Sequence, residues 1–361
     1  MKMIQYFIAC LALGRISVAQ GQVPDSVKLY AQQTVNAFAK DYPGLSVAVS
    51  QQGKIVWQTQ IGYVNLEQKT PVTPNTKFNI YSTSKMITGL AFLKLLHTGK
   101  LKSLDVKLGT IDPQLPQKFH NITIKHLLTH TSGIGHYQGR KDWIKFAALR
   151  VNTPAEAVTY FANRKLQSSP GKKYKYTTYG MVLASHILEK ITGKKYEEAL
   201  NYLLHFSSPI TLDSPTASKA TPYRKKRKKW QALPNINAAS KYGGGGLIAS
   251  AAQLVEAGQL LYSNSFMPPN KLKSYFRASF PQGKNNGVAF GTGAGIVPKF
   301  KNYKGEILYT LMGGGSPGGR SYLAVLTDLK VAVAITANFE GDGEKAYKMA
   351  FGLAKKFAGL E

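Results

Sequence analysis

The sequence predicts an α+β fold in which strands from both ends of the chain form one sheet and a mostly helical subdomain is inserted between them. Strand-like stretches occur before residue 80 and again after residue 285, whereas residues 82 to 262 alternate helical patterns with polar loops. The 361 residues, 43% of them hydrophobic, are enough for one large domain or two. We expect a sheet lobe from about 25 to 80 and 285 to 361, and a helical lobe from about 82 to 262.

The N-terminus has the pattern of a secretory signal peptide. Lys2 precedes an apolar run from Met3 to Leu13, and Ser17-Val18-Ala19 is a small-x-small cleavage pattern. Cleavage after Ala19 predicts a signal peptide at 1–19 and a mature domain at 20–361, exported to the periplasm or secreted. Cys10, the only cysteine, would be removed, so the mature chain would form no disulfide. A lipid-attachment motif at Cys10 is the alternative.

The elements of the sheet lobe follow from hydrophobic periodicity. Apolar spacing predicts an amphipathic helix from Asp25 to about Lys40, and alternating residues predict a hairpin of strands 45–50 and 54–62 around Gln51-Gln52-Gly53. Four later strands and a closing amphipathic helix are expected at 288–297, 305–312, 321–327, 331–337 and 343–358. Because the first and last segments supply strands to one sheet, the two termini should lie near each other.

The stretch from Tyr81 to Ile87 places a hydroxyl and an amine three residues apart, ahead of an almost entirely apolar helix. If that helix begins at Ser82, Lys85 lies one turn on and can take the serine proton, because burial lowers the pKa of a lysine. The helix N-terminus would favour the oxyanion. Ser84 competes as the hydroxyl, but Ile87, three residues further on, cannot be a base. Otherwise Ser82 only caps a core helix and Lys85 reaches water.

Histidine and tyrosine residues mark two further segments. His126 and His130 are four residues apart and His136 is nearby, a spacing that is compatible with a zinc site. However, Leu127 occupies the position at which a His-Glu-x-x-His zinc protease has glutamate. We therefore expect no metal, and expect the end of a helix there. Tyr176 precedes a predicted buried helix at 181–191 and beside a lysine can act as a phenolate base or proton relay, or only pack.

Two glycine-rich stretches are candidates for the walls of a cleft. Residues 243 to 246 precede a predicted helix at 251–262 and lack the Gly-Lys-Ser/Thr of a phosphate loop, which favours close backbone packing. Residues 312 to 321 join two strands, and their glycines would allow a backbone N–H to approach an oxyanion.

The formal charge of +29 predicts attraction to polyanions. The densest basic run is Arg224 to Lys229, and lysines are otherwise spread evenly, so we interpret this run as a solvated loop. The alternative is that it binds an anionic envelope polymer or lipid. Export argues against nucleic acid as a partner.

Four segments, in their order, resemble the serine β-lactamase-like and penicillin-binding protein family. That family includes class C β-lactamases, D-alanyl-D-alanine carboxypeptidases, certain esterases and the mitochondrial β-lactamase-like serine protease of animals. The segments are Tyr81 to Lys85, Ile124 to Ile134, Pro170-Gly171 with Tyr176 to Gly180, and Tyr242 to Ser250. The resemblance covers nearly the whole mature chain and implies a β-lactamase/transpeptidase-like fold, a five-stranded antiparallel sheet flanked by helices, with an all-helical lobe and a cleft between them.

The resemblance also implies roles for individual residues. Ser82 would be acylated, Lys85 and Tyr176 would exchange protons with it, and the backbone N–H groups of Ser82 and Gly315 would form the oxyanion hole. Water would then release the acyl group, without a metal or an organic cofactor.

The chain departs from the family pattern at the substrate-binding positions. Thr178 stands where an asparagine is usual, and Met312-Gly313-Gly314 replaces Lys-Thr-Gly or His-Thr-Gly. Methionine and glycine cannot grip a substrate carboxylate, which should weaken binding of such a group. This favours an ester, amide or peptide substrate without a carboxylate at that position, unless Arg320 or a surface lysine substitutes.

These features predict an exported serine hydrolase that acts on an ester, peptide or cell-wall-type substrate through a Ser82 acyl-enzyme. One alternative is a true D-alanyl-D-alanine carboxypeptidase or β-lactamase. The other is a catalytically inactive scaffold that binds the envelope.

Overall fold

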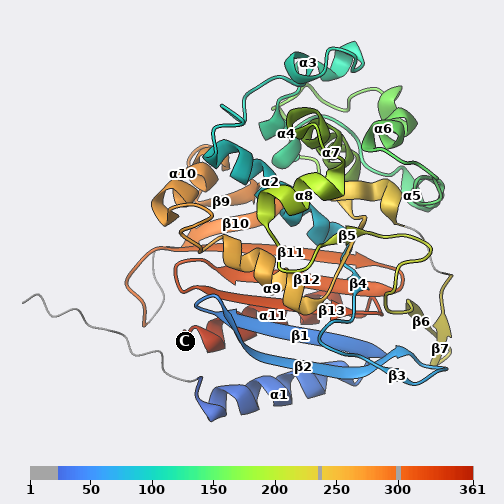
Figure 1. Ribbon diagram of the computed structural model, residues 1–361, viewed down its shortest axis with the longest axis vertical. Coiled ribbons are helices and arrows are strands. Elements are labelled where there is room, and N and C mark those ends of the chain that lie inside the picture. The colour runs from blue at the N-terminus through green and yellow to red at the C-terminus, as the bar shows by residue number, and fades with distance from the viewer. Residues whose placement is uncertain (1–22, 235–237, 298–301, 361) are drawn as a thin grey trace, which may run out of the picture.

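The computed structural model describes residues 23–234, 238–297 and 302–360 (Figure 1). The expected signal peptide and Cys10 lie outside these residues. An eight-stranded antiparallel sheet forms the centre, in the order β3-β2-β1-β13-β12-β11-β10-β9. Its strands are β1 Gly44–Gln51, β2 Lys54–Asn65, β3 Thr70–Pro71, β9 Asn286–Ala289, β10 Thr292–Val297, β11 Ile307–Ser316, β12 Gly319–Leu326 and β13 Val331–Ala337. The predicted pairing of strands from both ends of the chain is confirmed, since β1 lies beside β13.

The number of strands differs from the five that the resemblance implied. One predicted strand, 288–297, is two strands, because Phe290 and Gly291 have positive φ of 50° and 71° and turn the chain between β9 and β10. The two-residue strand β3 adds to the other edge. The predicted hairpin of β1 and β2 is confirmed, with Gln52 and Gly53 at positive φ in its turn.

Each face of the sheet packs against its own layer of helices. Side chains alternate along β13, so that Val333 and Ile335 join a core with helices α1 Asp25–Ala39 and α11 Gly343–Phe357. Ala332 and Ala334 point to the opposite core, which contains α9 Ala251–Leu260 and the helical lobe. Figure 1 shows the helical lobe above the sheet and α1 below it.

The helical lobe surrounds helix α2, Ser84–His97, in which every residue except Lys94 and His97 is buried. An apolar surface on all sides makes this helix a central element, as predicted. Helices α7 Thr178–Thr192 and α8 Tyr196–Leu204 and the 3₁₀ turns η1 Tyr81–Thr83 and η3 Ala239–Gly244 contact it. The lobe also contains α3 Leu108–Ile111, α4 Ile124–Leu128, α5 Gly139–Ala147, α6 Pro154–Ala162 and the turn η2 Gln117–Phe119. Helix α10, Pro269–Ser279, contacts β9. Among the residues described, none of the helices has the length and apolar character needed to cross a bilayer.

Two small sheets were not anticipated. Strand β8 Leu247–Ala249 pairs with β4 Phe78–Asn79 on one side and β5 Thr211–Leu212 on the other, and so joins the chain before Ser82 to the chain after the glycine run. The basic run, expected as a loop, is instead a hairpin of β6 Tyr223–Lys226 and β7 Lys229–Ala232. Arg227 and Lys228 take positive φ in its turn, and the cations from 224 to 229 are all exposed.

Candidate active site

Ser82 lies in a strained turn immediately before α2. The α-helix begins at Ser84 rather than at Ser82, because residues 81 to 83 form the tighter 3₁₀ turn η1. Tyr81 enters this turn with φ of 44°, an unfavourable conformation for a bulky residue. A 3₁₀ turn places side chains three residues apart above one another, so Ser82 still faces Lys85.

Lys85 is fully buried, and its hydrogen-bond partners in the described chain are neutral oxygen atoms. Its Nζ donates to Ser82 Oγ at 3.1 Å, to Thr178 Oγ1 at 3.4 Å and to the carbonyl oxygen of Gly244. Burial lowers the pKa of Lys85 to about 7. The amine is therefore about half neutral at pH 7 and can accept a proton.

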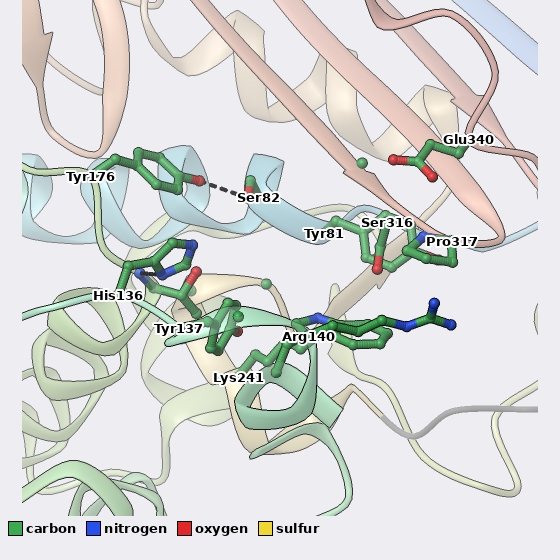
Figure 2. Close-up of a pocket in the computed structure, with 16 residues that line it drawn as sticks. Tyr81, Ser82, His136, Tyr137, Arg140, Tyr176, Lys241, Ser316, Pro317 and Glu340 are labelled. Carbon is green, nitrogen blue, oxygen red and sulfur yellow. Dashed lines mark hydrogen bonds between the residues drawn. The ribbon is translucent and has the colours of Figure 1, made fainter. Parts of the chain in front are cut away.

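Tyr176 approaches Ser82 from the segment before α7. Its hydroxyl donates to Ser82 Oγ at 2.7 Å, and Lys85 Nζ lies 4.8 Å from the centre of its ring (Figure 2). Burial raises the pKa of Tyr176 to about 12, although the hydrogen bond to Ser82 acts the other way. The phenol is thus protonated at neutral pH, which suits a proton relay better than a phenolate base.

Two histidines hold the segment that carries Tyr176. His130 Nδ1 accepts from the backbone N–H of Thr177 at 3.4 Å, and its ring centre lies 4.7 Å from that of Tyr176. His136 Nδ1 accepts from the N–H of Thr178 at 3.2 Å. Burial lowers the pKa of His130 to about 3 and that of His136 to about 4, so both rings are neutral and can accept these bonds.

The third histidine of the sequence pattern has a separate role. His126 Nδ1 accepts from the backbone N–H of Thr123 at 3.2 Å and completes a capping box at the start of α4. In the described part of the chain, no group of three or more His, Cys, Asp or Glu side chains is placed to hold a metal ion. The histidines thus have structural partners.

The glycines of β11 allow this strand to lie against the Ser82 turn. A Cβ at Gly314 would be 2.2 Å from the carbonyl oxygen of Ile80 and 3.0 Å from the backbone N of Ser82. Ser321 on β12 strengthens the junction by donating to Ile80 O at 2.6 Å. The next residue of β11, Gly315, lines the same cavity as Ser82, where its N–H and that of Ser82 are the expected oxyanion donors.

The other positions expected to bind substrate divide into two groups. Thr178 lines the cavity, whereas Met312, Gly313 and Gly314 are not among its lining residues. Met312 is buried in the core and a Cβ at Gly313 would meet the ring of Tyr322. Arg320, proposed as a substitute cation, donates instead to the carbonyl oxygens of Glu340 and Gly341 and is also absent from the lining.

Ser82 opens into a cavity of about 570 Å³ between the two lobes. Several of its lining residues were not singled out from the sequence. They are Tyr137, Arg140, Trp143, Lys241 and Glu340 (Figure 2). Lys241 lies just before the Tyr242 and glycine stretch, but a lysine there carries no signal of burial in the sequence alone.

Comparison with known proteins gives consistent matches. The Beta-lactamase family matches residues 31–355. The human mitochondrial protein named serine beta-lactamase-like protein LACTB is 25% identical over 291 residues, which cover 61% of this chain and 53% of that protein. A penicillin-binding protein of Bacillus subtilis is 24% identical and covers 83% of this chain and 69% of its own length. The chain thus spans about half the length of the mitochondrial relative.

Solved structures share the fold. A Pseudomonas syringae protein described as a beta-lactamase/D-alanine carboxypeptidase superposes with a TM-score of 0.73 at 17% identity, covering 91% of this chain and 98% of its own. At that identity the superposition establishes the architecture only. It agrees with the α+β fold of a large antiparallel sheet and a helical lobe.

Proposed function

The chain belongs to the beta-lactamase family of serine hydrolases, and from this premise we propose that it cleaves an ester, amide or peptide bond through acylation of Ser82. The observation that carries the proposal is the convergence on Ser82 Oγ of Lys85 Nζ at 3.1 Å and the Tyr176 hydroxyl at 2.7 Å, at the wall of an open cavity. A nucleophile with a base and a second proton-transfer group in hydrogen-bond reach is the arrangement that acyl transfer needs.

Lys85, Tyr176 and two backbone N–H groups have different roles in the acylation of Ser82. Neutral Lys85 takes the Ser82 proton while Oγ attacks the substrate carbonyl carbon, and the backbone N–H groups of Ser82 and Gly315 stabilise the oxyanion. As the tetrahedral intermediate collapses, the bond to the leaving group breaks and the proton held by Lys85 passes through Tyr176 to that group. Water, deprotonated by the same pair, then attacks the acyl carbonyl carbon. The bond from that carbon to Ser82 Oγ breaks, the carboxylic acid leaves, and the proton taken from water returns to Oγ.

Intact-mass analysis after incubation with a fluorophosphonate tests the nucleophile. We expect one adduct on the wild type and none on Ser82→Ala. Ser84→Ala is the matched control, because Ser84 is the neighbouring hydroxyl and its Oγ accepts from the N–H of Leu247 at 3.2 Å inside the protein. An adduct on Ser82→Ala, or its loss only in Ser84→Ala, would refute the assignment.

A D-alanyl-D-alanine carboxypeptidase or β-lactamase is the second candidate. It is supported by the description of the Pseudomonas syringae structure and opposed by Met312, which cannot bind a carboxylate from β11. Incubation with a fluorescent penicillin separates the two. Labelling of Ser82 by penicillin as well as fluorophosphonate favours the second candidate, and no adduct with either reagent favours a scaffold without catalysis.

Export and attachment to an anionic envelope surface are also part of the proposal. Export rests on the pattern from Lys2 to Ala19, and N-terminal sequencing of the expressed protein tests cleavage after Ala19.

Attachment rests on the exposed cations of the β6–β7 hairpin. The Trp230 ring packs 4.8 Å from the Phe339 ring and anchors this hairpin. Sedimentation with anionic vesicles should fall when residues 224 to 229 are neutralised, and unchanged binding would remove this part.

A further inference from the structure

Lys241 is a buried cation in the wall of the cavity, and none of the described residues forms a hydrogen bond or ion pair with its ammonium group. It lies in η3, is 5% exposed, and lines the cavity that contains Ser82. Its Nζ lies 5.0 Å from the centre of the Trp143 ring, but no hydrogen-bond acceptor or carboxylate in the described chain contacts it. The carboxylate that acts on it from a distance, Asp213, is occupied by Lys219 and by Asn79 Nδ2 at 2.9 Å.

A second cation stands at the mouth of the same cavity. Arg140 is exposed, lines the cavity from the start of α5, and has no ion pair in the described part of the chain. The one carboxylate among the described lining residues belongs to Glu340, whose Oε1 lies 3.9 Å from the guanidinium of Arg320. Figure 2 shows Glu340 at the upper right of the view, with Arg140 and Lys241 below it.

The surroundings of Lys241 explain why an anion would bind there. Burial lowers the pKa of Lys241 to about 8, and the charge of nearby Lys85 acts in the same direction. At neutral pH the ammonium group is therefore still mostly charged, although it is desolvated and unpaired. A buried charge without a partner is unfavourable. The ammonium group of Lys241 already loses its water when the protein folds, so an anionic group that enters the cavity can bind it without that desolvation cost.

We propose that the substrate carries a carboxylate that binds Lys241, with Arg140 at the cavity mouth, close to the bond that Ser82 cleaves. The proposal rests on the proposed function, because it concerns the substrate of the same site. It places carboxylate recognition on η3 rather than on β11, where Met312 cannot provide it. The substrate class is then an acidic ester, amide or peptide.

Two matched pairs of esters test the proposal. 4-Nitrophenyl hydrogen adipate and 4-nitrophenyl hexanoate differ in a carboxylate on the acyl side, and 3-acetoxybenzoate and 3-acetoxybenzamide differ in one on the leaving group. We expect the wild type to prefer the anionic member of at least one pair by about 10- to 100-fold in kcat/KM. Lys241→Met should abolish that ratio, Lys241→Arg should retain most of it, and Arg140→Met should reduce it by a smaller factor.

Lys102→Met is the charge-matched control, because Lys102 is an exposed lysine outside the cavity and its loss changes the net charge equally. The ratio should be unchanged in this variant. A wild-type ratio near one for both pairs, or a ratio that Lys241→Met leaves intact, overturns the proposal. Turnover of the neutral esters that disappears in Ser82→Ala would meanwhile show that the proposed function itself holds.

A binding measurement decides the question even if these esters are not turned over. Ser82→Ala is titrated with 3-acetoxybenzoate in a calorimeter, and the same is done with the double variant Ser82→Ala/Lys241→Met. Binding that weakens by about tenfold or more in the double variant supports the proposal. Equal affinity in the two proteins, or no binding to either, overturns it, and a thermal melt of each variant checks that it is folded.

Discussion

Lys85 and Lys241 are two buried lysines at the same site: Lys241 lines the cavity, whereas Lys85 contacts the lining residue Ser82. Lys85 is held by the oxygens of Ser82, Thr178 and Gly244, whereas Lys241, among the residues that the structure describes, contacts only the face of Trp143. Burial lowers the pKa of both, to about 7 and about 8. Desolvation alone therefore does not assign a role to a buried lysine. A buried lysine that contacts a nucleophile can take its proton. A buried lysine whose ammonium group has no hydrogen-bond acceptor can bind an anion.

The largest expected effect comes from replacing the first of these lysines. Lys85→Met should lower kcat/KM by about 10²- to 10⁴-fold for neutral and anionic esters alike, because it removes the group that accepts the Ser82 proton. Lys241→Met should instead act mainly on the ratio between the two kinds of ester. Steady-state kinetics on the matched pairs measures both, and a Lys85→Met enzyme within tenfold of the wild type would contradict the assigned base.

Removal of the phenol tests the other contact of Ser82. Tyr176→Phe keeps the ring that packs on His130 but deletes the donor at 2.7 Å from Ser82 Oγ. We expect kcat/KM to fall by about 10- to 100-fold, because proton delivery to the leaving group is lost while the base remains. An ester with a leaving group that needs no protonation, such as 4-nitrophenolate, should be affected less than an alkyl ester. Equal losses for the two would argue against the relay.

The pH dependence of kcat/KM also distinguishes Lys85 from Lys241. A base must be neutral, so kcat/KM for a neutral ester should rise about tenfold from pH 6 to pH 8 as Lys85, with its pKa lowered to about 7, loses its proton. The preference for an anionic ester should fall above about pH 8 as Lys241 deprotonates. His130 and His136, with lowered pKa values, and Tyr176, with a raised one, keep their protonation state over this range. A flat profile from pH 6 to 8 would exclude Lys85 as the base.

The smallest expected effect is on stability. Lys241→Met should raise the free energy of unfolding at pH 7 by about 1 kcal/mol, because it removes a buried unpaired charge and loses only the contact with Trp143. Lys85→Met should bring no such gain, since it leaves the Gly244 carbonyl without its donor. Urea unfolding at pH 7 measures both variants. A Lys241→Met protein that is less stable than Lys85→Met would contradict the expectation that Lys241 is the unpaired charge.

The same variants change how stability depends on pH. The folded state binds fewer protons than the unfolded state between about pH 8 and the ordinary lysine pKa of about 10.4, because the folded pKa of Lys241 is lowered. The contribution of Lys241 to the free energy of unfolding of the wild type should therefore increase as the pH rises through this range. The contribution should be absent from Lys241→Met, which urea unfolding at pH 8 and pH 10 measures.

Local features of the fold and site followed from the sequence. The α1 helix, the β1–β2 hairpin and the buried α2 helix were predicted because each pattern is set by residues close in the chain. The pairing of Ser82 with Lys85 belongs to the same class, since it needs only one turn of backbone. The split of β9 from β10 was missed because Phe290, a residue with no turn preference, takes a positive φ there.

Residues close in the chain were thus enough to predict the paired terminal strands, the candidate nucleophile and its nearest base, since periodicity and short spacing act within single elements. Which distant residues line the cavity follows only from the folded chain. Tyr176 reaches Ser82 across 94 positions, and Lys241 lines the cavity beside Trp143 from a separate segment. Burial, and with it the pKa and binding role of a lysine, depends on what other segments pack around it, which the spacing of residues along the chain does not encode.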